Sequence, residues 1–191
     1  ANNRGIRQFQ EDNEEDKEYL HAFAQRIMGR LMFLYFIQKK GWLDGDRRFL
    51  DNQFHRAHRD KLNFYRDVLE PLFFETLNLP EAQRTDRAKA FGDVPYLNGG
   101  LFEKDYDFLI HLDNKLFSPD EEDGLLCFFN NYNFTVTEDT PLDVEVALDP
   151  EMLGKVFENL LAEQERKAKG TFYTPRVIVH AMCRDALAEY L

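Results

Sequence analysis

The sequence predicts a mainly α-helical protein that carries small β-hairpin elements. Apolar residues recur at spacings of three and four along several segments, which is the period of one buried helix face. Helix-start signals stand at Ser118-Pro119, Asp149-Pro150 and Thr174-Pro175. Turn dipeptides near residues 98–100 and short β-branched or aromatic runs predict hairpins around residues 92–112 and 132–147.

The composition excludes several classes of protein. The 191 residues carry 24 Lys and Arg against 35 Asp and Glu, a net charge of −11, so the chain is not a free-standing basic DNA clamp. Cys127 and Cys183 follow no metal or redox spacing, which excludes a disulfide scaffold. The longest apolar stretch, residues 31–37, is too short to cross a membrane, and the first ten residues form no secretory signal. We therefore expect a reduced, cytoplasmic protein.

A long helix is predicted from the acidic residues 11–18 to an end signal at Lys39, Lys40 and Gly41. Its apolar face consists of Leu20, Phe23, Ile27, Leu31, Leu34 and Ile37. A second helix is predicted over residues 60–77, with Leu62, Tyr65, Val68, Leu69 and Leu72 on one side. Pro71 lacks an N–H donor, so we expect it to kink or divide this second helix.

The most basic part of the chain lies between these two helices. It contains Arg47, Arg48, His55, Arg56, His58, Arg59 and Lys61. Two interpretations are open: a solvated helix face, or a surface that contacts phosphate in an assembled complex. In the second interpretation the candidate DNA contacts are Arg47, Arg48, Arg56 and Arg59.

The second half of the chain alternates loops with helices. Residues 94–102 are typical of an ordered aromatic loop with short strands, and Ser118-Pro119 begins a helix that continues through Phe129. Short strands are expected at residues 132–136 and 144–146. Helices follow over residues 149–161 and from Thr174 to the end. The last helix has no stop signal, so we expect it to continue in a longer parent protein.

Neither a metal site nor a catalytic nucleophile is predicted. The five His residues have no Cys or carboxylate at zinc spacing, and His55 with His58 is typical of a surface pair. No G-x-S-x-G or reactive-cysteine motif is present. The parts of a metal-dependent nuclease pattern, at residues 119–120 and 165–167, fall on two separate predicted helices, whereas that chemistry needs carboxylates that converge on one ion.

The strongest local constellation is KGTFYTPR, over residues 169–176, at the start of the last helix. It combines a glycine turn, two adjacent aromatic residues and a capped helix N-terminus, whose free N–H groups attract a carboxylate or a phosphate. On periodicity alone, the simpler interpretation is that the aromatic residues lie in the core and Thr174 is an ordinary N-cap.

Residues 149–161 (DPEMLGKVFENLL), a charged spacer and residues 170–176 (GTFYTPR) together resemble the region before the catalytic core of N6-adenine DNA methyltransferases. The best match is to γ-class enzymes of restriction–modification systems, especially large single-chain type IIG-like proteins and, more distantly, type I modification subunits. Residues 94–103 (VPYLNGGLFE) and 132–136 (YNFTV) resemble segments of the type IIG-like group. The resemblance runs from roughly residue 18 to the end and is most specific in its last part.

The resemblance implies a site for S-adenosylmethionine. In that family the Phe-Tyr-Thr-Pro element is motif X, which closes over the methionine end of the cofactor. The cofactor-binding candidates are therefore Thr171, Phe172, Tyr173, Thr174 and Pro175. The family's glycine-rich cofactor motif and its Asn-Pro-Pro-aromatic catalytic motif are missing, so no catalytic residue is assigned to this chain.

The expected organisation is a helical connector or N-terminal domain over residues 1–148, followed over residues 149–191 by the leading edge of a Rossmann-like methyltransferase domain. The resemblance implies a parent that is a site-specific DNA adenine-N6 methyltransferase of a restriction–modification or phage-defence system, acting on double-stranded DNA with the rest of its methyltransferase domain in cis. We expect the fragment alone to be inactive and to hold no metal. Apolar residues Ala181, Met182, Leu187 and Leu191 make a dimer of the isolated fragment plausible. The alternative is a helical protein–protein interaction module without a catalytic role.

Overall fold

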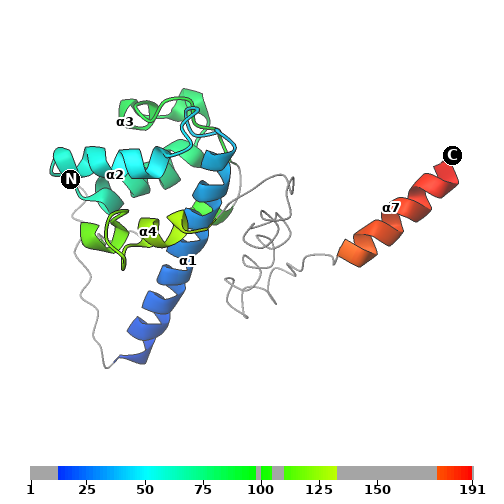
Figure 1. Cartoon of the computed structure of the whole chain (residues 1–191), viewed down its shortest axis with the longest axis horizontal. Coiled ribbons are helices and arrows are strands. Elements are labelled where there is room, and N and C mark those ends of the chain that lie inside the picture. The colour runs from blue at the N-terminus through cyan, green and yellow to red at the C-terminus, as the bar shows by residue number, and fades with distance from the viewer. Residues whose placement is uncertain (1–12, 98–99, 105–109, 133–175, 191) are drawn as a thin grey trace. The chain divides into compact units, whose positions relative to one another are not determined.

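The computed structural model describes residues 13–97, 100–104, 110–132 and 176–190 (Figure 1). The chain divides into two units, Ala1–Ala147 and Leu148–Leu191. The described residues are mainly helical and include no strand, which confirms the predicted helical class. The small hairpin predicted over residues 92–112 is wrong for the described part of that range, and the hairpin over residues 132–147 lies outside the described residues apart from Tyr132.

The first helix, α1 (Glu14–Lys39), is the longest element of the first unit. Oδ1 of Asn13 caps it by accepting hydrogen bonds from the backbone N–H groups of Glu15 (3.0 Å) and Asp16 (3.4 Å). The predicted apolar face is buried from Phe23 to Ile37, whereas Leu20 is 41% exposed. The C-terminal half of α1 is buried on several sides, so it forms the support against which other helices pack.

Helix α2 (Phe49–Arg59) occupies the region that the sequence marked only as basic. Its apolar residues Leu50, Phe54 and Ala57 are buried, whereas the basic residues between and after them are exposed. The buried Gln38 of α1 accepts a hydrogen bond from the backbone N–H of Leu50 (3.1 Å), which satisfies a donor of the first turn of α2. Figure 1 shows α2 lying across the part of α1 near its C-terminal end.

The turn between α1 and α2 contains left-handed backbone at Gly41, Asp44 and Gly45. Asp44 pairs with Asp93 twice: its backbone N–H donates to the Asp93 carbonyl (2.8 Å), and its Oδ1 accepts from the Asp93 N–H (3.0 Å). Gly92, with φ of 84°, lies so close to the Asp44 carboxyl that a Cβ there would overlap it. This contact ties the turn after α1 to a segment far along the chain.

The second predicted helix begins at residue 64 rather than at residue 60. Asp60 ends α2 and Lys61 is left-handed (φ 55°), so Leu62 precedes the new helix and is 42% exposed. Wide, π-type turns, η1 (Tyr65–Leu69) and η2 (Leu72–Leu77), flank Pro71, whose own backbone stays helical. The irregularity predicted at Pro71 is therefore a change in hydrogen-bonding period rather than a break.

Two buried arginines organise the loops after this helix. Arg84, between η3 (Glu81–Gln83) and α3 (Asp86–Lys89), donates to the carbonyls of Leu79 (3.1 Å) and Val94 (2.8 Å). Arg30 of α1 donates to the carbonyls of Leu101 (2.7 Å), in η4 (Gly100–Phe102), and of Glu103 (3.0 Å). Because guanidinium groups satisfy these carbonyls, the described part of this loop needs no strand pairing.

The helix start predicted at Ser118-Pro119 is wrong. Helix α4 (Leu125–Asn130) begins after Gly124, and η5 (Asn114–Phe117) precedes the intervening turn. Oγ of Ser118 accepts from the N–H of Asp120 (3.2 Å), and the Ser118 carbonyl accepts from the N–H of Cys127 (3.3 Å). The Ser118 side chain therefore closes a turn instead of capping a helix that starts at this residue, and the Ser118 carbonyl accepts from an N–H of the first turn of α4.

Aromatic side chains make up much of the core of the first unit. Phe64 lies against Phe54 and Phe117, with ring centroids 5.2 Å and 5.6 Å away, and Tyr35 of α1 stacks on Phe129 of α4 at 5.1 Å. The Tyr35 hydroxyl lies 3.0 Å from the Leu126 carbonyl, which is a second link between α1 and α4. Burial raises the pKa of Tyr35 far above its usual value, so this hydroxyl stays protonated.

In the second unit, helix α7 (Arg176–Tyr190) confirms the last predicted helix. Its Met182 and Leu187 side chains are exposed. The helix predicted over residues 149–161 and Leu191 lie outside the described residues. The same is true of the strands predicted at residues 132–136 and 144–146, apart from Tyr132. No helix in the described ranges is both long and apolar enough to cross a bilayer.

Candidate functional site

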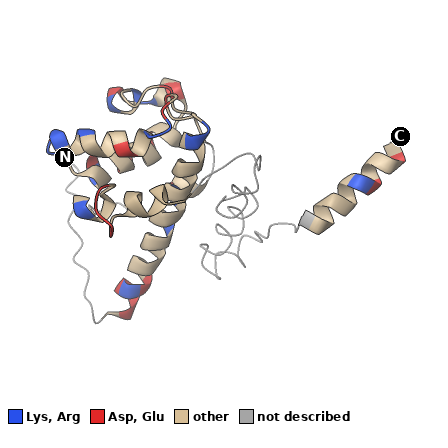
Figure 2. Cartoon of the chain, viewed as in Figure 1, with Lys and Arg blue, Asp and Glu red and all other residues tan. Residues whose placement is uncertain are grey.

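The four arginines predicted as DNA contacts lie at the two ends of α2. Arg47 and Arg48 stand just before its first turn, and Arg56 and Arg59 lie in its last turn, so the two pairs are separated by roughly 15 Å along the helix axis. Figure 2 shows Lys and Arg segments at both ends of α2. The structure therefore does not bring the four side chains into one cluster.

The partners of these arginines differ. Nη2 of Arg48 lies 3.3 Å from Oδ2 of the buried Asp51. Oδ1 of Asp51 in turn accepts a hydrogen bond from Nδ2 of Asn130 in α4 (3.2 Å). Arg48 therefore takes part in the polar contact that joins α2 to α4. Arg59 lies 3.7 Å from Asp60, and this exposed pair contributes little stability. Within the described residues, Arg47 and Arg56 have no ion-pair partner.

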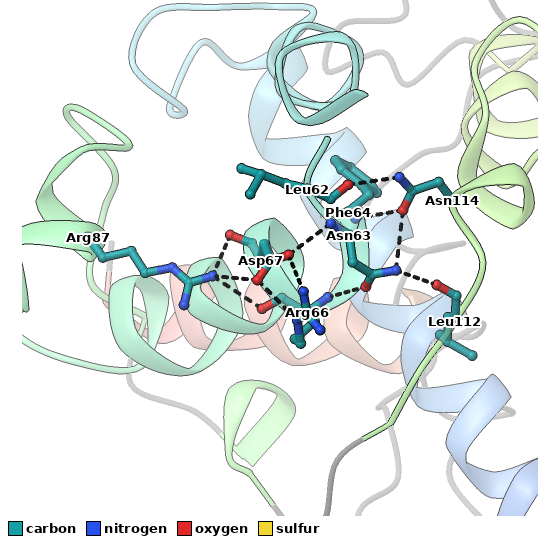
Figure 3. A network of polar contacts seen from close by, with 8 residues as sticks. All are labelled: Leu62, Asn63, Phe64, Arg66, Asp67, Arg87, Leu112 and Asn114. Atoms are coloured by element: carbon teal, nitrogen blue, oxygen red, sulfur yellow. Dashed lines mark hydrogen bonds and ion pairs between the residues drawn. The ribbon is translucent and has the colours of Figure 1, made fainter. Parts of the chain in front are cut away.

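A polar network surrounds the start of the helix at residue 64 (Figure 3). Asn63 is its N-cap: its Oδ1 accepts from the Arg66 N–H (2.9 Å), and its own N–H donates to Oδ2 of Asp67 (2.8 Å). Asn114, from a segment some fifty positions later, accepts from the Phe64 N–H (2.7 Å) and donates to the Leu62 carbonyl (2.9 Å). The network therefore joins two distant parts of the chain at the helix start.

Asp67 lies between two arginines, as Figure 3 shows. Arg66 donates to it from Nη2 (2.8 Å) and Nε (3.1 Å), and Nη2 of Arg87 lies 3.6 Å from its Oδ1. Arg87 also donates to the Asp67 carbonyl (2.7 Å). Hydrogen bonding by Arg66 lowers the pKa of Asp67, and the same contact raises the pKa of Arg66, so this pair stays charged. One carboxylate between two guanidinium groups leaves the cluster with one net positive charge.

Two pockets adjoin this network and share Leu62. The first, of about 340 Å³, lies among α2, the helix after residue 64 and the segment following α3, and its lining includes Arg56, Asp60, Asp67 and Arg87. The second, of about 330 Å³, is lined by Lys61, Leu62, Asn63, Arg66, His111, Asp113 and Asn114. Several basic side chains therefore line hollows on either side of one exposed leucine.

Of the predicted DNA contacts, only Arg56 lines one of these pockets. Arg66, Arg87 and His111 were missed because no local pattern connects them to α2. The role of Asn63 could have been predicted from the sequence, since an Asn directly before an apolar helical period is a typical N-cap. That signal also places the helix start at residue 64.

The described residues hold no group of three His, Cys, Asp or Glu side chains placed to bind a metal ion. His55 lies 3.8 Å from Asp120, and His58 stacks on Phe54. Cys127 and Cys183 are free thiols. Residues 165–167 of the nuclease pattern lie outside the described residues.

The cofactor-binding candidates Thr171, Phe172, Tyr173, Thr174 and Pro175 also lie outside the described residues. Helix α7 begins directly after them at Arg176, and its first turn contains no Asp or Glu. An N-terminus without a competing carboxylate suits an anionic ligand group. The described first turn of α7 therefore contains no acidic residue that would repel such a group.

Comparison with known proteins gives two matches. The model of a family described as a domain of unknown function, DUF7814, matches residues 4–110. A protein of Methanocaldococcus jannaschii, named "Putative type II restriction enzyme and methyltransferase", is 32% identical over 176 residues, which cover 86% of this chain and 14% of that protein. The chain thus spans about one seventh of the length of this curated relative. No solved structure matches the chain.

The second match confirms, at a coarse level, the relationship to restriction–modification proteins that the sequence predicted. The γ-class and adenine-N6 assignments stay predictions.

Proposed function

The chain belongs to the DUF7814 family, and we propose that it is the helical part of an S-adenosylmethionine-dependent DNA adenine-N6 methyltransferase from a restriction–modification or phage-defence system. The observation that carries the proposal is the match of 86% of the chain to a single relative with a restriction and methyltransferase name. The motif-X resemblance at residues 170–176 supplies the finer assignment to type IIG-like, adenine-N6 enzymes.

In this proposal the two parts of the chain have different roles. The first part is a connector whose helices present polar and basic side chains toward DNA. Residues 149–191 begin the methyltransferase domain, and the rest of that domain lies in cis in the longer parent. The fragment alone transfers no methyl group, because it lacks the Asn-Pro-Pro-aromatic motif that such enzymes use on a flipped adenine.

Thr171, Phe172, Tyr173, Thr174 and Pro175 would hold S-adenosylmethionine. The aromatic rings would pack on the cofactor or on the walls of its pocket. The backbone N–H groups at the start of α7 would donate hydrogen bonds to the carboxylate of the cofactor. When bound, the cofactor supplies the methyl group. The contribution of this chain is binding and orientation.

The test is titration of S-adenosylmethionine into the full-length protein and into its Tyr173→Ala and Thr174→Ala variants. Loss of a packed ring or of a cap at the ligand corresponds to about 1–2 kcal/mol, so we expect each variant to bind about tenfold more weakly. Tyr190→Ala, an exposed tyrosine at the other end of α7, is the matched control and should bind as the parent does.

The activity is measured as N6-methyladenine in digested DNA by mass spectrometry. Equal cofactor affinity in all four proteins would remove Tyr173 and Thr174 from the site. A full-length protein that binds no S-adenosylmethionine and forms no methyladenine would favour the interaction module instead.

A further inference from the structure

The surface around Leu62 combines features that no local motif of the sequence connects. It comprises Arg56, Lys61, Leu62, Arg66, Asp67 and Arg87, and is called the Leu62 surface below. Two pockets of about 340 and 330 Å³ meet at Leu62, whose apolar side chain is 42% exposed between them. The surface is thus hollowed on both sides of one apolar contact point.

This surface is positive although the chain as a whole carries a net charge of −11. Arg56 and Lys61 are exposed and have no ion-pair partner in the part of the chain that the structure describes. The carboxylate of Asp67 is shared by Arg66 and Arg87, which leaves an excess positive charge beside them. Two other acids line the pockets: Asp60 lies 3.7 Å from Arg59, and Asp113 accepts a hydrogen bond from the backbone N–H of Lys115. They are fewer than the four cations of the surface, Arg56, Lys61, Arg66 and Arg87, even together with Asp67. A local concentration of uncompensated cations on an acidic protein marks a binding surface for an anion.

The guanidinium groups of Arg66 and Arg87 are held in place before any ligand arrives. Arg87 is fixed by its hydrogen bonds to the carbonyls of Arg66 (3.3 Å) and Asp67 (2.7 Å), and Arg66 by two bonds to the Asp67 carboxylate. Each guanidinium has five N–H donors, and these contacts occupy only part of them. These internal contacts hold the excess positive charge of the cluster at one place on the surface.

We infer that the Leu62 surface binds the sugar–phosphate backbone of duplex DNA, with Arg56 and Lys61 as the direct phosphate contacts and Leu62 against the sugar edge between them. The Arg66–Asp67–Arg87 cluster adds fixed positive charge beside these contacts. This inference rests on the proposed function, because it assumes that the parent protein acts on DNA. It assigns no DNA contact to Arg48, which is bound to the buried Asp51.

The test measures the binding of the full-length protein to a short non-cognate duplex across about 50 to 200 mM salt, where log Kd depends linearly on log salt. The variant Arg56→Gln with Lys61→Asn removes both proposed contacts, and Asn tolerates the left-handed φ of 55° at position 61. We expect binding about tenfold weaker at low salt and a salt slope shallower by about two units, one for each lost phosphate contact.

Two further variants serve as controls. Lys17→Gln with Lys39→Gln removes the same amount of charge from the two ends of α1 and should keep the slope of the parent. Arg47→Gln tests the opposite end of α2 and should also leave the slope unchanged. Thermal melting of each variant shows that the comparison is made between folded proteins.

The outcomes separate this inference from the proposed function. If Arg56→Gln with Lys61→Asn keeps the slope of the parent, the Leu62 surface is not the contact, whether or not the protein methylates adenine. If the slope falls as expected but no N6-methyladenine forms, the surface stands and the proposed function fails. A full-length protein that does not bind DNA overturns the surface inference directly.

Discussion

At the scale of single residues, Gly92 shows how one position constrains a distant turn. Its φ of 84° is unfavourable for any residue with a Cβ, and the Asp44 carboxyl occupies the place where a Cβ would stand. Asp44 cannot move aside without losing its hydrogen bond to the Asp93 N–H. Gly92 is therefore required by both its backbone conformation and its neighbour.

We expect Gly92→Ala to lower the free energy of unfolding by about 2–3 kcal/mol, through backbone strain and the overlap with Asp44. Gly45→Ala is the matched control, because Gly45 has a similar φ of 69° but a Cβ there would meet no atom within 4 Å. It should therefore lose only about 1 kcal/mol. The measurement is urea unfolding with the m-value compared between variants. Equal losses for the two variants would show that the Asp44 contact contributes nothing.

At the scale of elements, the start of the helix at residue 64 depends on side chains from three segments. Asn63 accepts from the Arg66 N–H, and Asp67 accepts from the Asn63 N–H. Asn114 accepts from the N–H of Phe64, the first residue of the helix. Arg87 forms an ion pair with Asp67. Four N–H groups at a helix start need partners, and here side chains supply several of them. The helix and the segment around residue 114 should therefore lose stability together.

Asp67→Asn tests this arrangement through pH. The folded-state pKa of Asp67 lies below its ordinary value of 3.8, so its charge stabilises the fold fully above about pH 4, and this contribution is lost as the pH falls below that value. We expect Asp67→Asn to lose about 1–2 kcal/mol at pH 7 and to show a smaller further loss between about pH 4 and pH 2 than the parent does.

Chemical denaturation at a series of pH values measures this difference. Glu122→Gln, which removes an exposed carboxylate from the turn before α4, is the control and should follow the parent at every pH. If the parent and Asp67→Asn lose stability in parallel between about pH 4 and pH 2, the ion pairs of Asp67 with Arg66 and Arg87 do not cause the acid sensitivity of the parent.

At the scale of the whole molecule, the described residues of the first unit contain an apolar core of their own. Its buried apolar side chains run from Phe23 to Phe129 and include the contacts of Phe64 with Phe54 and Phe117. A unit with a hydrophobic core of its own can fold independently.

We therefore expect residues 1–147, produced alone, to fold and to unfold in one cooperative thermal transition, followed by near-ultraviolet circular dichroism of the aromatic core. Tyr35→Phe is a useful companion variant, because it keeps the ring stacked on Phe129 but removes the hydroxyl near Leu126, and it should melt at a lower temperature. A broad, non-cooperative loss of signal from residues 1–147 would show that the unit depends on the rest of the chain.

The sequence by itself determined the elements whose signals are local. The helical class, the limits of α1 and the last helix after Thr174-Pro175 follow from apolar spacing and end signals within a few turns. The resemblance around residues 170–176 and the relationship to restriction–modification proteins were also available there. Helix α2 has the same kind of apolar period, formed by Leu50, Phe54 and Ala57, so the sequence also contained a local signal for this helix. Only the basic character of the segment was interpreted, as a possible phosphate contact.

Only the tertiary structure decided the features that depend on distant partners. Arg30 and Arg84 donate to backbone carbonyls in the segment for which short strands were predicted. The same holds for the Leu62 surface, which joins Arg56 to Arg87 across a turn, a helix and a second turn. Local periodicity carries no information about such contacts, because their energies arise only when segments far apart in the chain are brought together by the core.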